Sequence, residues 1–168
     1  IESLEERCLL ASFVVNAESD LSDSGRAPGI CDTELNPDAG VPASGQCTLR
    51  AAIESSNETP ELDTITFSLG SSAEIQTLGH LEVTGAIQII GPSGGVRITN
   101  SGPIELSAGI LLAGGGSELR NLVMNGFAEA IRLVSDNNIV AGSRIGVNAD
   151  GIAMIGNQVG IMVEGDNN

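Results

Sequence analysis

The stretch that decides the predicted fold is His80-Leu-Glu-Val-Thr-Gly-Ala-Ile-Gln-Ile-Ile-Gly91. It aligns without a gap with Pro103-Ile-Glu-Leu-Ser-Ala-Gly-Ile-Leu-Leu-Ala-Gly114, at a shift of 23 residues. The positions that carry the match are Glu82/Glu105, Ile87/Ile110 and Gly91/Gly114. A fixed shift between such segments predicts structural repeats that stack on one another. We therefore expect Ile87 to lie directly beside Ile110.

A second correspondence lies further along the chain, where residues 131–138 match residues 161–168 at a shift of 30. Residues 148–157 then form an expected loop insertion. Apolar residues alternate within each unit, as in Leu81-x-Val83, and this period of two is typical of strands. Strands this short bury an apolar face only by stacking. The pattern predicts an all-β fold, a right-handed parallel β-helix (solenoid), and a fixed repeat is not expected of the competing fold, a β-sandwich.

The composition limits the classes of protein that fit. The chain has 168 residues, 22 acidic side chains against seven arginines and a net charge of -15, so binding to nucleic acid or to anionic lipid is not expected. The core must be aliphatic, because Trp and Tyr are absent and there are only three Phe. No apolar run is long enough to suggest insertion into a membrane.

A capping helix is expected at residues 48–57. Thr48 is a suitable N-cap, and Leu49, Ala52 and Ile53 follow helical spacing. With Leu49 and Ile53 facing inward, the helix would cover the first sheet edge. The chain then divides into an N-terminal tail (1–12), a capping segment with an acidic loop (13–62), and coils (63–168) that we expect to continue in a longer protein.

The capping segment resembles the CSLREA-type extracellular β-helix proteins of bacteria. The residues that carry the resemblance are Val15-Asn16, Cys47-Thr-Leu-Arg-Ala-Ala-Ile53 and Asp63-Thr-Ile-Thr-Phe67, with Ala51 in place of the family's Glu. Residues 4–10 are in addition similar to the LEPR-XLL segment of exported planctomycete proteins, with Glu6 in place of Pro. These resemblances imply a bacterial protein that is secreted or displayed at the cell surface.

Three cysteines fit such a compartment. Cys31 and Cys47 enclose a loop rich in Pro and Gly, which a disulfide would stabilise by about 3 kcal/mol. Two buried thiols or a pair of metal ligands are the alternatives. Cys8 would be free or would form an intermolecular bond.

Few residues suggest chemistry, and we predict no catalytic residue and no cofactor other than a possible Ca²⁺. His80 is the only histidine, and at a predicted corner it lacks a partner for acid–base catalysis. If Glu82 stacked on Glu105, the pair would belong to a solvated outer face, or it could raise a carboxyl pKa for acid catalysis or bind Ca²⁺. Arg97 stacked on Arg120 could form salt bridges or clamp an anion. Solvation or Ca²⁺ binding are the interpretations for the loop acids Asp20, Asp23, Asp32, Glu34 and Asp38.

Two functions remain open at this stage. The first is a non-catalytic extracellular or cell-surface module, a rod or an adhesin, that contacts an extracellular polysaccharide or another cell-surface component. The second is the N-terminal part of a polysaccharide lyase or glycoside hydrolase. The absence of Lys, Trp and Tyr favours the first, because sugar-cleaving sites commonly use such side chains. The oligomeric state is left open.

Overall fold

The computed structural model describes residues 10–24, 29–33, 45–103, 108–152, 154 and 156–168. These residues form one α-helix, α1 (Leu49–Asn57), and three sheets. The first sheet contains β1 (Ser12–Val15), β2 (Asp63–Phe67), β5 (Ile87–Ile90), β8 (Glu118–Arg120) and β11 (Ile139–Ala141). The second contains β3 (Glu74–Thr77), β6 (Val96–Asn100), β9 (Leu122–Asn125) and β12 (Arg144–Ile145). The third contains β4 (Leu81–Val83), β7 (Ala108–Leu112), β10 (Glu129–Leu133) and β13 (Val159–Val163).

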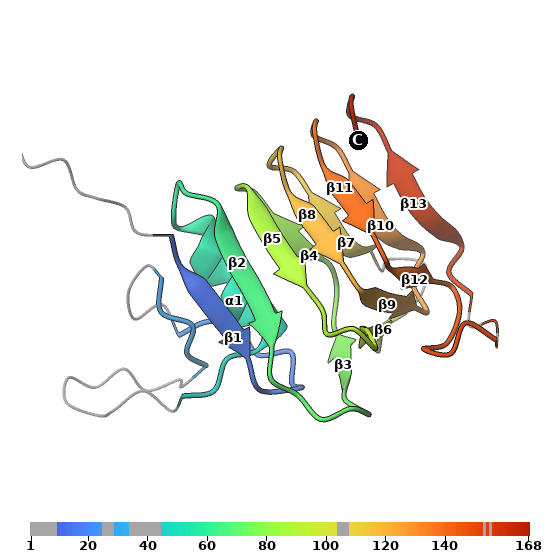
Figure 1. Ribbon diagram of the computed structural model, residues 1–168, viewed down its shortest axis with the longest axis horizontal. Helices are drawn as coiled ribbons and strands as arrows, with labels where there is room; N and C mark the ends of the chain where they lie inside the picture. Colours follow the sequence, from blue (N-terminus) through green and yellow to red (C-terminus); the bar gives the residue numbers. More distant parts are fainter. Residues whose placement is uncertain (1–9, 25–28, 34–44, 104–107, 153, 155) are drawn as a thin grey trace, which may run out of the picture.

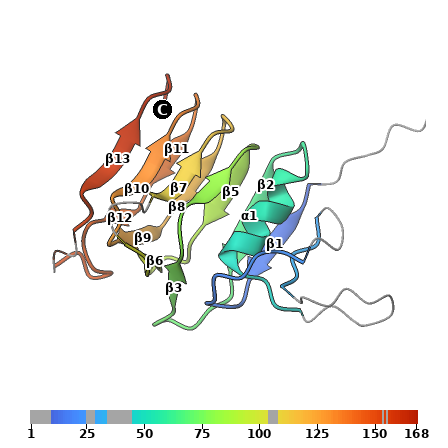
Figure 2. The same cartoon turned by 180° about the vertical axis from the view of Figure 1, so that it is seen from behind.

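From β2 onward the chain visits the first, second and third sheets in turn, and each new strand pairs in parallel with the strand of the preceding pass. Figure 1 shows the result as a stack with α1, β1 and β2 at one end and β13 at the other. The view from behind shows α1 beside β2 at that same end (Figure 2). The two ends of the molecule therefore differ in what covers them.

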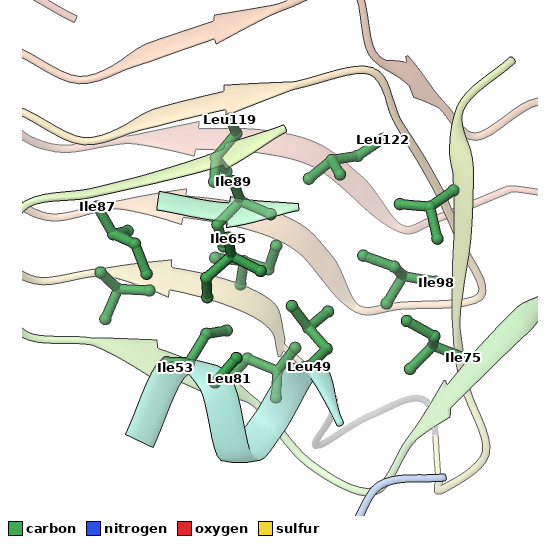
Figure 3. Close-up of a cluster of buried hydrophobic side chains, with 14 of the residues drawn as sticks. Leu49, Ile53, Ile65, Ile75, Leu81, Ile87, Ile89, Ile98, Leu119 and Leu122 are labelled. Carbon is green, nitrogen blue, oxygen red and sulfur yellow. The ribbon is translucent and has the colours of Figure 1, made fainter. Parts of the chain in front are cut away.

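The core lies between the sheets and is built from alternating strand positions. Its inward rows are Ile65, Ile89 and Leu119 in the first sheet, Ile75, Ile98 and Met124 in the second, and Leu81, Ile110 and Ile131 in the third. Each of these side chains is buried, and several point toward one another in Figure 3. Full burial of such a side chain contributes roughly 1.5–3 kcal/mol.

The predicted fold class, an all-β right-handed parallel β-helix (solenoid) with an N-terminal capping α-helix, is wrong as a whole, although its helix is present. The structure contains three parallel β-sheets together with an α-helix. Ile110 lies beside Leu81 rather than Ile87, and the residue that pairs with Ile87 is Asp63. The gapless alignment in fact superposes β5 of the first sheet on β7 of the third.

The physical reason is that the connections between strands differ in length, whereas the short aliphatic strands resemble one another. Leu81 pairs with Ile110, Ile110 with Ile131 and Ile131 with Ile161, so the spacing changes from one pair to the next. Alternating Ile, Leu and Val match one another at many shifts. The residue types of these strands alone therefore do not determine which strands pair and in which register.

Other parts of the prediction are confirmed. The helix begins and ends within the expected range. The second correspondence also holds, because Ile131 pairs with Ile161, and the amide nitrogen Nδ2 of Asn138 donates to Oδ1 of Asn168 at 3.0 Å.

Candidate functional site

The segment before α1 is fixed to the helix by a disulfide and by capping. Cys31 and Cys47 form the predicted disulfide. Thr48 follows directly, and its side-chain oxygen accepts a hydrogen bond from the amide of Ala51 at 3.0 Å while donating to the carbonyl of Leu21 at 2.5 Å. Two stretches far apart in the sequence thus meet at the first turn of the helix.

The helix covers the apolar interior at this end of the stack. Leu49 and Ile53 have 0% and 1% exposure, and both point from α1 toward the side chains of the sheets in Figure 3. The helix contacts β1, β2 and β4. The two residues expected to face inward do so.

An arginine ties the acidic loop to this end. The Nε and Nη2 atoms of Arg50 each donate to Asp20 at 2.9 Å, and Asp20 also accepts from the amide of Leu78 at 2.7 Å. Arg50 donates further to the carbonyls of Leu78 and His80. Asp20 is therefore a structural ion-pair partner rather than a solvated residue.

The remaining loop acids are accounted for differently. Asp32 is buried, and its amide donates to Asp23 at 3.0 Å, while the amide of Asp23 donates to Glu54 at 2.7 Å. Glu34 and Asp38 lie outside the described residues, as does Cys8. Within the described ranges, no three His, Cys, Asp or Glu side chains are grouped as metal ligands would be.

A hollow of about 440 Å³ lies between α1 and β4, lined by Arg50, Glu54, Asn57, His80 and Glu82 among others. His80 and Glu82 are about half exposed, and their Nε2 and Oε2 atoms are 3.8 Å apart. On one side of the hollow, the side-chain amide of Asn57 donates a hydrogen bond to the carbonyl of Glu82 and accepts one from the amide of Thr84. A solvated pair at this distance is a weak basis for acid–base catalysis, which requires a partner within hydrogen-bond reach.

The predicted stacks of like charges are not the ones found. Glu82 lies beside Leu111 of β7, and Glu105 falls outside the described residues. Arg97 belongs to the second sheet and Arg120 to the first, so these two arginines do not stack. Each instead forms a salt bridge, which was the first of the two interpretations for these arginines.

The salt bridge with Arg97 changes the pKa of its partner, Glu74. Nη1 of Arg97 lies 2.9 Å from Oε2 of Glu74, and Thr99 donates to the other carboxylate oxygen at 2.8 Å. The hydrogen bond from Arg97, followed by that from Thr99, holds the pKa of Glu74 below its ordinary value. Glu74 is therefore charged at neutral pH.

A second hollow, of about 380 Å³, lies on the outside of the stack where the first and second sheets meet. Its wall is mostly apolar, with Phe67, Leu69, Pro92, Val96 and Val123, and Arg97 stands at it. Arg144 reaches this wall, because its Nη1 donates to the carbonyl of Gly94 at 3.3 Å. Sequence reasoning missed Arg144, and no signal pointed to it, since only the folded chain brings β12 near residue 94.

No helix in the described residues has the length and apolar character that crossing a membrane requires. The chain matches no protein-family model, no curated protein and no solved structure.

Proposed function

We propose that the chain is a non-catalytic extracellular or cell-surface module with a structural or adhesive role, located in the N-terminal part of a longer bacterial protein. The observation that carries this proposal is the Cys31–Cys47 disulfide, which closes the acidic loop against the start of α1. Disulfides form and persist in oxidising compartments outside the cytosol. The resemblance of residues 13–67 to CSLREA-type extracellular proteins supports the same compartment.

The arrangement of the strands supports a structural role. All ten pairings between named strands are parallel, and successive strands continue the same three sheets. In such a stack each added strand extends both the hydrogen-bond ladder and the apolar core, as an elongated structural module requires. At β13 the inward residues Ile161 and Val163 remain 40% and 53% exposed, so a further parallel strand would bury apolar surface there.

An outward row of polar side chains on the first sheet supports an adhesive role. Thr64, Gln88 and Glu118 lie side by side on β2, β5 and β8. The side-chain oxygen of Thr64 lies 3.4 Å from that of Gln88, and Gln88 donates to Glu118 at 3.2 Å. A row of amide, hydroxyl and carboxylate groups can exchange hydrogen bonds with the hydroxyl groups of an extracellular polysaccharide. We therefore place the expected partner on this face.

The proposal is tested by binding and turnover assays on the full chain. Pectin, alginate and sulfated algal polysaccharides are incubated with the protein, with and without Ca²⁺, and new reducing ends and unsaturated products are measured. We expect no product, together with retention of the protein on intact bacterial cells or on immobilised polysaccharide. Gln88→Ala should weaken this retention, whereas Gln76→Ala, an exposed Gln on the second sheet, should not.

Turnover that is lost in Glu82→Gln would overturn the proposal in favour of a polysaccharide-cleaving enzyme. Free thiols at Cys31 and Cys47 in protein isolated from its native source, detected by alkylation and mass spectrometry, would overturn the extracellular assignment. The two parts of the proposal can thus fail separately.

A further inference from the structure

We propose that the hollow between the first and second sheets, defined above by Phe67, Leu69, Pro92, Val96 and Val123, binds an aliphatic carboxylate. The chain would enter the hollow, and the carboxylate would pair with Arg144. This site goes beyond the proposed function, because neither a structural rod nor an adhesive face requires a small-molecule site.

The charge of Arg144 is the first step. The arginines at positions 50, 97, 120 and 132 each form an ion pair with a carboxylate. Within the described part of the chain, Arg144 forms no such pair, and its printed hydrogen bond is to the carbonyl of Gly94. An arginine carries five N–H donors, so most of those on Arg144 are open to an anion. This is unexpected in a chain with a net charge of -15.

The position of Arg144 is the second step. A Cβ at Gly95 would lie 2.7 Å from Cγ2 of Val123 and 3.5 Å from Nη1 of Arg144. Gly95 also has φ +85°, a conformation that side chains disfavour. Glycine at this position therefore leaves room for Val123, and the guanidinium of Arg144 lies within contact distance of the same wall, whose lining includes Gly94 and Gly95.

The apolar lining of the hollow determines the chemistry of the part of the ligand beyond its head group. Phe67 and Leu69 are only partly buried, and Pro92 is exposed, so apolar surface remains available to a ligand. Val123 is among the lining residues and is fully buried, although it occupies an outward position between Arg97 and Arg144 on adjacent strands. Removing alkyl surface from water contributes about 0.8 kcal/mol for each CH₂ group buried.

The head group follows from the chemistry of the arginines. A guanidinium matches a carboxylate in a planar, two-point geometry. Arg97 is already neutralised by Glu74, so the local charge suits a monoanion better than a dianion such as a phosphate. The long-range repulsion from the acidic chain is screened within about 8 Å at physiological ionic strength.

The test uses octanoate and its uncharged counterpart 1-octanol, titrated into ¹⁵N-labelled full chain. We expect octanoate to shift the amide resonances of Gly94, Gly95 and Val123. Arg144→Gln should weaken octanoate binding about tenfold or more, in line with the loss of a charge-assisted pair, and should leave octanol binding nearly unchanged. Arg132→Gln is the matched control, because it removes the same charge from the third sheet and should have no effect.

A second variant covers the possibility that Arg144→Gln disturbs the fold. Ala149→Glu places a carboxylate at the partly exposed edge of the hollow and should abolish octanoate binding. The dispersion of its amide resonances should remain that of a folded protein. The proposal is overturned if octanoate shifts only residues of β13, which would indicate adsorption to the exposed apolar end. It is also overturned if both variants bind octanoate like the parent chain.

Discussion

Both ends of the stack carry large aliphatic residues, but these side chains are buried at one end and about half exposed at the other. At the α1 end, Leu49 and Ile53 are fully buried and the segment before them is linked by a disulfide. At the β13 end, Ile161 and Val163 point along the same inward row as Ile131 and Leu133 but remain about half exposed. Burial of the end strands, rather than their composition, therefore distinguishes a closed end from one that can accept another strand.

The largest effect is expected from breaking the closed end. Ile53→Asp would place an unpaired carboxylate in the apolar interior, so we expect the free energy of unfolding to fall by about 4 kcal/mol or more. Urea denaturation followed by circular dichroism measures the change. Glu58→Gln is the control, at an exposed position directly after the helix. An Ile53→Asp variant as stable as the parent would show that α1 does not close the stack.

The disulfide is the second way to weaken this end. Replacing both Cys31 and Cys47 by Ser should lower the stability by about 3 kcal/mol, because the unfolded chain regains the freedom of the closed loop. Thermal melting of the parent with and without a reducing agent provides an independent measurement. The reductant should have no effect on the double Ser variant, and an equal effect on both proteins would contradict the explanation.

A matched pair of substitutions sharpens the comparison between the ends. Ile131 and Ile161 are neighbours in register on β10 and β13, with 0% and 40% exposure. Ile131→Ala should cost about 3 kcal/mol and Ile161→Ala about 1 kcal/mol, because the second site loses less buried surface. The difference of about 2 kcal/mol can be measured by denaturant titration. Equal costs would mean that β13 is covered in solution, and sedimentation would then show self-association.

Elements with distinctive residues could be predicted from the sequence, whereas strands marked only by alternating aliphatic residues could not. The helix at residues 49–57 was predictable because a cap, an amphipathic period and a cysteine pair all point to one structure. The pairing of Ile131 with Ile161 was predictable because Asn138 and Asn168 are polar residues at matching positions, which distinguish this alignment from other matches between aliphatic strands. The register between Leu81 and Ile110 was not, since nothing but alternation marks those strands.

The candidate site was predictable only in part. The disulfide follows from the sequence, but the hollow beside Arg144 depends on contacts between segments about 50 positions apart. An ion pair such as Arg97 with Glu74 likewise depends on the register of β3 and β6. Because sequence analysis placed Arg97 in the wrong register, it could not identify the partner that neutralises this arginine.

The smallest expected effect lies between the two ends, at the pair formed by Glu74 and Arg97 on the outer face of the second sheet. Since the hydrogen bonds from Arg97 and Thr99 lower the pKa of Glu74 in the folded chain, the unfolded state binds more protons as the pH falls. This contribution is complete above the ordinary glutamate pKa of about 4.3 and is lost as the pH falls through the lower folded value. Arg97→Gln should therefore cost less than about 1 kcal/mol at pH 7, because both side chains are about one-third exposed.

The expected pH dependence provides the control for this prediction. The stability difference between the parent and Arg97→Gln should shrink as the pH falls below the ordinary glutamate pKa of about 4.3, because Glu74 is then protonated first in the variant and, at lower pH, in the parent. Denaturant titrations at pH 7, 5 and 3 measure the difference, and Glu74→Gln should show a similar loss that also shrinks as the pH falls, because the pH-dependent contribution belongs to Glu74 of the parent. A difference that stays constant down to pH 3 would mean that Arg97 acts through packing against its neighbours rather than through the charge of Glu74.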